Sequence, residues 1–280
     1  MPKLIPSKLD KPEILAAIFH PQAEAPNDTP PSCEEFEVQV ENGVSLGCRF
    51  FHPHPTSPVI VYFHGNGETV SDYDQIAPHF LEAGLNLFVA SYRGYGWSSG
   101  EPSVAALYHD AAMVLERVQE YCRSGELSDE LFIMGRSIGW AASIDLGYRF
   151  PEQIKGLIID SGFANTLPLA ARLGYNVSDS DLREEDCFNN LGKIREIEIP
   201  TLILHGAEDQ LIPLYEAVKL QAESGAKTKQ LFVVPGADHN SLILRGGVTY
   251  FETIKSFTNT VTGRNTWRQR RKKYKDQEHQ

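Results

Sequence analysis

A serine between two glycines is the first candidate for chemistry in this chain. The segment GRSIG, residues 135–139, follows an apolar run and begins a stretch rich in alanine and leucine. A chain that changes from strand to helix at one residue strains that residue, and glycines two positions before and after it let strand and helix pass each other. The hydroxyl of Ser137 would then lie at the carboxyl end of a sheet, where open α/β sheets bind ligands. The context favours this interpretation over a serine that only caps a helix.

A serine hydroxyl becomes a nucleophile when a histidine removes its proton and an acid orients that histidine. After a serine on a strand-to-helix turn, the acid and then the histidine are expected in loops that follow later strands. Asp209 and His239 each come shortly after an apolar run and in that order, so we predict them as acid and base. Glu208 and Asp238 remain competing candidates, although adjacent side chains in a loop rarely point the same way.

The oxygen of a substrate carbonyl gains negative charge during such an attack, and backbone N–H groups must stabilise it. One donor comes from the residue after the nucleophile and the other from the loop after the third strand. That loop is HGNGE, residues 64–68, whose two glycines let the backbone pass close to a substrate. We assign the donors to the N–H groups of Asn66 and Ile138, against the alternative of an ordinary glycine-rich turn.

Other chemistry finds little support in the pattern. The glycine-rich segments match neither a phosphate loop nor a dinucleotide fingerprint, and the histidines and cysteines do not fall at metal-ligand spacings. We therefore predict no cofactor and no metal. His64 and His205, each before a glycine at a strand end, are expected to make structural hydrogen bonds.

The elements that must position these residues alternate between strand and helix. Continuous apolar runs predict strands buried on both faces, as in a parallel sheet covered by helices. These runs are 58–63, 85–90, 131–134, 156–159, 201–204 and 231–234. Helices are expected between and after them, at 70–83, 102–121, 138–150, 213–222 and 248–261. Before them, alternating residues from 35 to 51 with Asn-Gly between predict an antiparallel hairpin. The result is one α/β domain.

The domain is expected over residues 33–263, with additions. Residues 1–32 predict an arm on the surface with a short helix at 12–19, and residues 163–200 an insertion that forms a small cap. Residues 264–280 predict a solvated basic tail, since seven basic and two acidic side chains give them a net charge of +5.

Charge and composition exclude several classes of protein. The net charge of −11 leaves −16 on the body without the tail, which repels phosphate backbones, so we expect no nucleic-acid binding. No apolar run approaches the roughly 18 to 20 residues that cross a bilayer. The start of the chain lacks the pattern of a secretory signal, and the four cysteines show no CxxC spacing. These features predict reduced cysteines and a cytoplasmic location.

Together these segments resemble the α/β-hydrolase family over about residues 35–262. HGNGE, SYRGYGWSSGEPS, GRSIG, LHGAEDQLIP and GADHN occur in the family's order. The segment at 91–103 with GRSIG is similar to the small-cap branch of protein depalmitoylases and uncharacterised bacterial hydrolases. The resemblance implies an eight-stranded, mostly parallel sheet with an antiparallel second strand, and serine hydrolase chemistry on esters, thioesters or amides. Two departures are Trp140, where this branch has a small residue, and the missing cysteine-rich arm of the depalmitoylases.

We predict a serine hydrolase that acts on a small-molecule ester or acylated substrate through an acyl-enzyme. Trp140, Leu167 and Leu169 are candidates to line its pocket. An acidic body disfavours anionic substrates, and the insertion at 163–200 is too short to build a deep tunnel, so neutral short-chain esters are expected. The alternatives are an amide hydrolase resembling the serine aminopeptidases, and a non-catalytic scaffold in which Trp140 blocks the serine.

Overall fold

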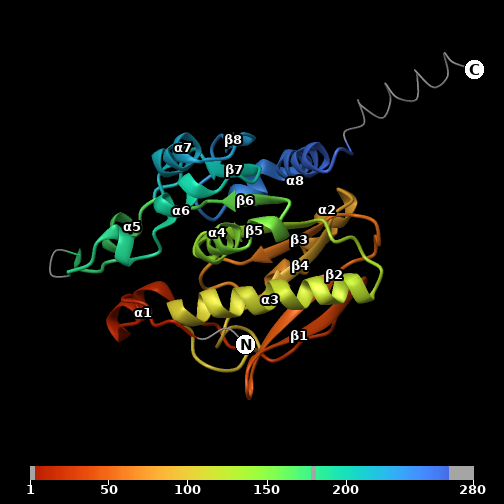
Figure 1. Cartoon of the computed structure of the whole chain (residues 1–280), viewed down its shortest axis with the longest axis horizontal. Coiled ribbons are helices and arrows are strands. Elements are labelled where there is room, and N and C mark those ends of the chain that lie inside the picture. Colours follow the sequence, from red (N-terminus) through yellow and green to blue (C-terminus); the bar gives the residue numbers. More distant parts are fainter. Residues whose placement is uncertain (1–3, 178–180, 265–280) are drawn as a thin grey trace, which may run out of the picture.

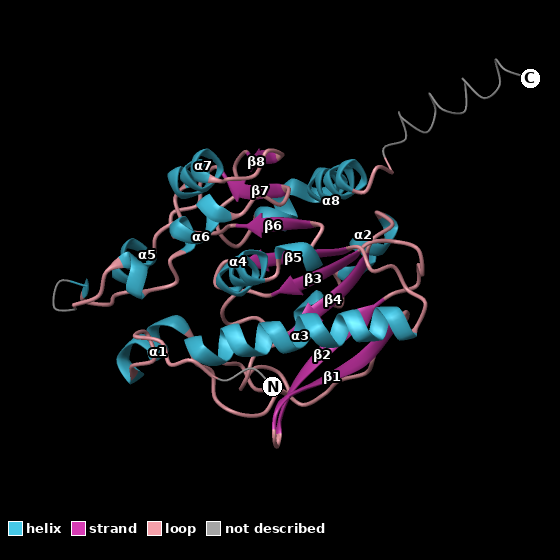
Figure 2. Cartoon of the chain, viewed as in Figure 1, coloured by secondary structure: helices cyan, strands magenta, loops and turns pink. Residues whose placement is uncertain are grey.

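The computed structural model describes residues 4–177 and 181–264, and over these ranges eight strands form one sheet (Figures 1 and 2). Its order is β1-β2-β4-β3-β5-β6-β7-β8. The leading hairpin joins β1 (Cys33–Glu41) to β2 (Val44–Phe51), and β2 pairs antiparallel with both β1 and β4. The remaining strands are parallel: β3 (Val59–Phe63), β4 (Asn86–Ala90), β5 (Leu131–Arg136), β6 (Gly156–Asp160), β7 (Thr201–Gly206) and β8 (Lys229–Val234). The predicted fold class is confirmed.

Helices cover both faces of the sheet, which explains why β3, β4, β5, β6 and β7 are buried at every residue. On one face lie α3 (Val104–Ser124), α4 (Gly139–Arg149) and α7 (Leu214–Glu223). On the other lie α2 (Ala77–Glu82) and α8 (Leu242–Val261). In Figure 1, α4 and α7 lie to the left of the parallel strands, and α2 and α8 lie to their right.

Two predicted helices differ from the observed ones. The segment at 70–83 is a short 3₁₀ turn, η1 (Val70–Tyr73), followed by α2. Pro78 has no N–H and suits a first helical turn rather than a helix interior, so it begins a new helix. α8 begins at Leu242 rather than Val248, and its backbone kinks at Gly247, where φ is 49°. The predicted start of this helix is therefore the first residue after the kink.

The insertion between β6 and β7 forms a small cap that projects from the sheet (Figure 1). It holds α5 (Thr166–Arg172), the 3₁₀ turn η4 (Glu184–Asp186) and α6 (Asn190–Glu196); a further turn, η2 (Pro151–Gln153), precedes β6. The Glu184 carboxylate accepts the N–H groups of Thr166 and Leu167 at 2.7 and 2.9 Å. These bonds satisfy free donors at the start of α5 and hold the two halves of the cap together.

The N-terminal arm is more deeply integrated than its polar composition suggests. It contains α1 (Pro12–Ile18), and Leu9, Ile14 and Ile18 are buried. The Asp10 carboxylate accepts the N–H of Val104 at 2.7 Å, at the start of α3. The predicted surface arm therefore packs against the domain, because its apolar side chains join the core cluster.

At the other end of the chain, Arg264 pairs with Glu130 at 2.6 Å and donates to the Thr56 carbonyl at 2.7 Å. The rest of the predicted basic tail lies outside the described residues. Over the described ranges, no helix combines the length and the apolar character needed to cross a membrane.

Candidate active site

Ser137 stands on a strained turn between β5 and α4. Its φ is 53°, a left-handed conformation that costs a non-glycine residue free energy. A Cβ on Gly139 would lie 2.1 Å from the Phe63 carbonyl oxygen, and one on Gly135 would lie 2.4 Å from the Gly139 oxygen. Glycine is therefore required at both flanking positions, as the sequence pattern predicts. The turn presents the serine side chain at the carboxyl edge of the sheet.

Two loops bring a histidine and a carboxylate to this serine. His239 Nε2 lies 3.0 Å from Ser137 Oγ, and His239 Nδ1 lies 2.8 Å from Asp209 Oδ2. Asp209 is buried, and its Oδ1 accepts the N–H of Ile212 at 2.8 Å. This second bond fixes the carboxylate, which in turn orients the imidazole. The structure thus places the three predicted residues in one hydrogen-bonded row.

The competing carboxylates lie elsewhere. Glu208 is exposed, and Asp238 is exposed and accepts the Ser241 hydroxyl at 2.7 Å. Neither makes a hydrogen bond to His239 within the described residues. The loop geometry therefore selects Asp209, because consecutive side chains point in different directions.

The histidines at the two strand ends have structural bonds. His205 Nε2–H donates to the Ile212 carbonyl at 2.7 Å, and His64 Nδ1–H donates to the Gly65 carbonyl at 2.8 Å. Burial lowers the pKa of both imidazoles, since the charged form would lose its hydration. We infer that both rings are neutral and shape the loops around the serine.

Two residues with free backbone N–H groups lie beside the serine. Asn66, Ser137 and Ile138 all line one cavity. Within residues 4–177 and 181–264, neither the Asn66 N–H nor the Ile138 N–H has a hydrogen-bond partner. Free N–H donors beside a nucleophile can bind a developing oxyanion. The loop that carries Asn66 is held through its side chain, whose Oδ1 accepts the Tyr95 hydroxyl at 2.7 Å.

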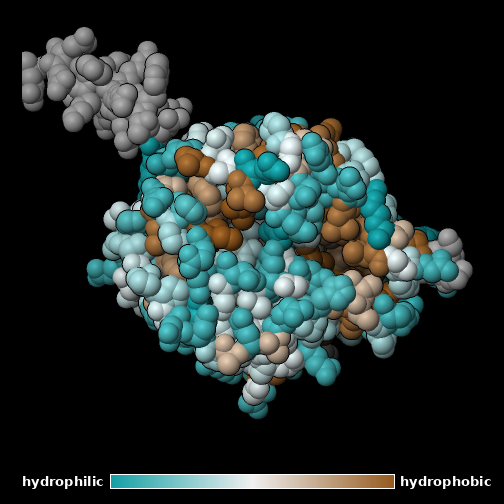
Figure 3. Space-filling model, turned by 180° about the vertical axis from the view of Figure 1, so that it is seen from behind, coloured by the Kyte–Doolittle hydropathy of each residue, from teal (hydrophilic) through white to brown (hydrophobic). Residues whose placement is uncertain are grey.

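The cavity at the serine measures about 80 Å³ and its walls are apolar. It lies between the cap and the N-terminal arm; its lining includes Leu9, Ile14, Ile18, Leu167, Leu169 and Leu182. Figure 3 shows hydrophobic residues gathered at a hollow on the side from which the cap projects. The predicted pocket residues Leu167 and Leu169 therefore reach this cavity.

Trp140 does not line the cavity, contrary to the sequence expectation. Its indole is fully buried and donates its N–H to the Phe163 carbonyl at 3.2 Å. Gly162 makes room for it: a Cβ there would lie 2.9 Å from the indole ring. The large side chain is thus accommodated in the core, and it does not cover Ser137.

Comparison with known proteins identifies the family of this chain. The model of the family described as "Serine aminopeptidase, S33" matches residues 54–174. Alpha/beta hydrolase domain-containing protein 17C of Xenopus tropicalis is 31% identical over 232 residues, which are 80% of this chain and 69% of the relative. Protein bem46 of Schizosaccharomyces pombe is also 31% identical, over 80% of this chain and 76% of its own length. The chain belongs to the α/β-hydrolase family.

Solved structures share the fold of this α/β-hydrolase. The Pyrococcus furiosus esterase Pf2001 superposes with a TM-score of 0.70 over 86% of this chain and 98% of its own, at 18% identity. A Paleococcus ferrophilus monoacylglycerol lipase superposes with a TM-score of 0.60 over 77% and 99%, at 17% identity. At this identity the likeness concerns the fold.

One part of the site was missed by sequence reasoning: an ion pair between Arg136 and Glu68. The Arg136 guanidinium contacts the Glu68 carboxylate and donates to the His239 carbonyl at 2.9 Å. Glu68 also accepts the N–H of Gly65 and the Tyr73 hydroxyl, each at 2.7 Å. The pair therefore joins the serine turn, the loop of Asn66 and the loop of the catalytic-base candidate. The sequence did contain one signal for this pair: Arg136 is the only charged residue in the GRSIG segment.

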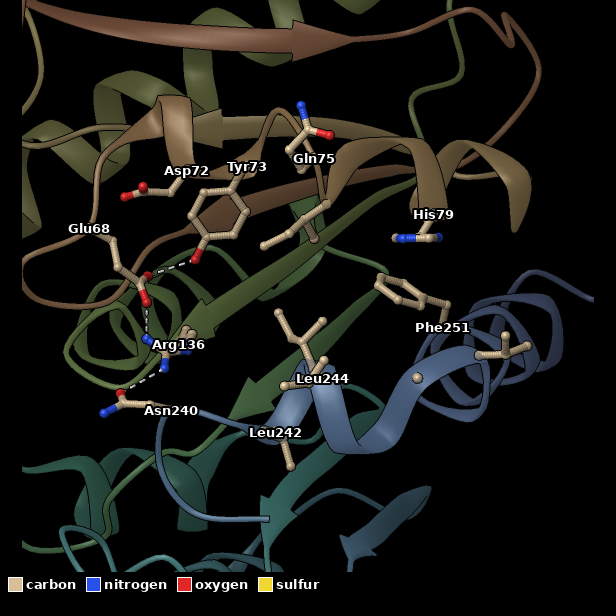
Figure 4. A pocket seen from close by; sticks show the side chains of 14 residues that line it. Glu68, Asp72, Tyr73, Gln75, His79, Arg136, Asn240, Leu242, Leu244 and Phe251 are labelled. Carbon is tan, nitrogen blue, oxygen red and sulfur yellow. Dashed lines mark hydrogen bonds and ion pairs between the residues drawn. The ribbon is translucent and has the colours of Figure 1, made fainter.

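This ion pair closes one end of a second groove, which lies between α2 and α8 and measures about 690 Å³. Figure 4 shows Glu68, Arg136 and Asn240 at that end, with Leu242, Leu244 and Phe251 along the α8 side. Burial opposes ionisation of Glu68, but the neighbouring guanidinium and the hydrogen bonds outweigh it and hold the pKa of this carboxyl below its ordinary value. Glu68 is therefore an anion at neutral pH.

Arg136→Met should lower kcat by about tenfold, because His239 loses one of the bonds that hold its loop. It should also lower the free energy of unfolding by about 2 kcal/mol, less than the 3–5 kcal/mol for a fully buried pair, because Glu68 is partly exposed. Steady-state kinetics and urea unfolding measure both effects.

Arg149→Met is the matched control. Arg149 also pairs with a carboxylate, Asp145 at 2.6 Å, and donates to a carbonyl, Tyr108 O at 2.9 Å, but it lies at the far end of α4 from the serine. The Arg149→Met substitution should lower the free energy of unfolding and leave kcat unchanged. Equal effects of the two variants on kcat would show that Arg136 does not position the site.

Proposed function

We propose that this protein is a serine hydrolase that cleaves a carboxylic ester or thioester through an acyl-enzyme. The observation that carries the proposal is the hydrogen-bonded row from Asp209 through His239 to Ser137, beside two free amide donors. Nucleophile, base, orienting acid and oxyanion donors are the parts that acyl transfer needs. The presence of all four parts at one site supports the proposal more strongly than any single sequence motif does.

The geometry supports a two-stage reaction. Ser137 Oγ attacks the carbonyl carbon while His239 Nε2 takes its proton, and the N–H groups of Asn66 and Ile138 bind the oxyanion. The tetrahedral intermediate collapses, and the leaving alcohol or thiol departs with the proton from His239. Water then attacks the acyl-enzyme, gives a proton to His239 and releases the carboxylic acid; that proton returns to Ser137. Asp209 stabilises the imidazolium formed in each stage.

The cavity supports a short, uncharged acyl group. Its apolar walls offer nothing to a charged chain. Since about 10–15 Å³ of such space holds one water-sized group, about 80 Å³ holds on the order of six groups. The acidic body disfavours anionic substrates such as acyl-CoA. A neutral ester with a short acyl chain fits both conditions.

A fluorophosphonate probe tests the proposal. Such a probe phosphonylates a serine only when a base has activated it. The wild-type protein should be labelled, and Ser137→Ala should not. Absence of labelling in the folded wild-type protein would favour the non-catalytic alternative.

A series of p-nitrophenyl esters tests the substrate. We expect the highest kcat/KM for short acyl chains of about two to eight carbons, because the cavity holds few groups. A maximum at sixteen carbons would contradict this expectation.

The description of the matched family as a serine aminopeptidase favours amide hydrolysis as the second candidate function. Cleavage of aminoacyl anilides without turnover of any ester would replace the esterase proposal with this one.

A further inference from the structure

The cavity at Ser137 has two walls, and one of them comes from a segment far away in sequence. The cap supplies Leu167 and Leu169, whereas Leu9, Ile14 and Ile18 belong to the N-terminal arm. Figure 1 shows α1 beside the cap at the same edge of the sheet. The arm precedes residues 54–174, where the family model matches, so its role here has to be derived from its own contacts.

Polar contacts hold the arm in a defined place next to the reacting groups. Asp10 accepts the N–H of Val104 at 2.7 Å and so caps α3. At the other end of α1, the N–H of His20 donates to Asn66 Oδ1 at 2.8 Å, and His20 Nδ1 lies 2.7 Å from Asn66 Nδ2. The arm is therefore bonded to Asn66, the residue whose N–H is the proposed oxyanion donor. An ion pair of Lys8 with Asp186 joins it to the cap, but Lys8 is largely exposed and this pair adds little.

The buried side chains of α1 point into the space that an acyl chain would occupy. Ile14 and Ile18 lie one helical turn apart, so they present one face of α1, and their exposed fractions are 3% and 9%. Both contribute to the cavity wall opposite the cap. In an apolar cavity the length of a bound chain is limited by the first side chain that it meets, because overpacking costs free energy.

We propose that α1 is the second wall of the acyl site and that Ile14 and Ile18 determine the acyl length that this enzyme accepts. The inference rests on the proposed function, since an acyl site presupposes an acyl-enzyme at Ser137. It adds a specificity element in the N-terminal arm, formed by Ile14 and Ile18 and positioned by the bonds of Asp10 and His20.

The test is an acyl-length series on wall variants. Ile14→Ala and Ile18→Ala each remove three carbon atoms from the wall and should admit longer chains. Each methylene that finds apolar surroundings favours binding by about fourfold. The ratio of kcat/KM for the octanoate over the acetate p-nitrophenyl ester should therefore rise by about fifteenfold in each variant, which corresponds to about two added methylenes. Ile14→Phe should lower the same ratio, because it fills the cavity.

Two substitutions serve as controls. Ile5→Ala changes the same kind of side chain in the same arm, but at a position that is 79% exposed. Ile154→Ala changes a buried isoleucine outside the cavity and accounts for a general loss of packing. Both should leave the ratio within about twofold of wild type, since neither contacts the acyl chain.

The outcomes separate this inference from the proposed function. If the folded wild-type protein is not labelled by a fluorophosphonate, the proposed function fails and this inference fails with it. If labelling persists in the wall variants but the ratio moves less than threefold, the role of α1 is overturned and the hydrolase stands. Where an alanine variant does not fold, Ile14→Val and Ile14→Phe decide, because their shifts should have opposite signs.

Discussion

Ser137→Ala should lower kcat for an activated ester by about 10⁴-fold or more, because no other group replaces the lost nucleophile. His239→Ala should have a similar effect, since the serine then loses the base that lies 3.0 Å away. The two residues act as a unit, so the double variant should lose little beyond either single variant. The rate of p-nitrophenyl acetate hydrolysis by each purified variant, compared with that of the wild-type protein, measures these effects.

The control for this result is a measurement that shows that each variant is folded. Ser137 occupies a left-handed turn that alanine must also adopt, so circular dichroism and the melting temperature should accompany the kinetics. A folded Ser137→Ala protein with full activity would refute the assignment of the nucleophile. A double variant that loses the product of the two single effects would show that serine and histidine act independently.

Asp209→Asn should lower kcat by roughly 10³- to 10⁴-fold. The carboxylate accepts a hydrogen bond from His239 Nδ1–H at 2.8 Å, which keeps the proton on Nδ1 and leaves Nε2 free to take the serine proton. An asparagine amide can donate instead and stabilise the wrong tautomer. The ratio of wild-type to variant kcat, with KM determined separately, measures this effect, because orientation of the base acts in the transition state rather than in substrate binding.

Glu208→Gln is the matched control for this variant. It makes the same change of carboxylate to amide one residue earlier, on an exposed side chain. Its effect on kcat should be less than about tenfold, because it contacts none of the reacting groups. A reversal of the two effects would mean that Glu208 is the orienting acid.

Patterns of residue types within a few positions of one another explain most of the predictions that were correct. Strands such as Val59–Phe63 and Leu131–Arg136 are apolar at nearly every position and buried at every position. The glycines at 135 and 139 are needed for the close approach of backbone atoms, and this requirement is visible as a spacing of two residues around the serine. The loops after β7 and β8 follow from the strand pattern, and so does the order of acid and base.

Local patterns failed where one residue interrupts an element or where distant segments meet. Pro78 divides a predicted helix, and the kink at Gly247 lies inside α8, just before its predicted start at Val248. Trp140 was expected at the substrate because of its size. The space beside Gly162, on a different element, instead places it in the core.

The amino-acid sequence by itself therefore determined the fold class, the strained serine and the choice of residues that can carry acyl transfer. Each of these depends on residue types within a few positions of one another. The tertiary structure decided which acid faces His239, the Arg136–Glu68 pair that ties three loops together, and the burial of Ile14 and Ile18 against the cap. These contacts join residues tens to hundreds of positions apart, and such pairings depend on packing of the whole domain rather than on local conformational preference.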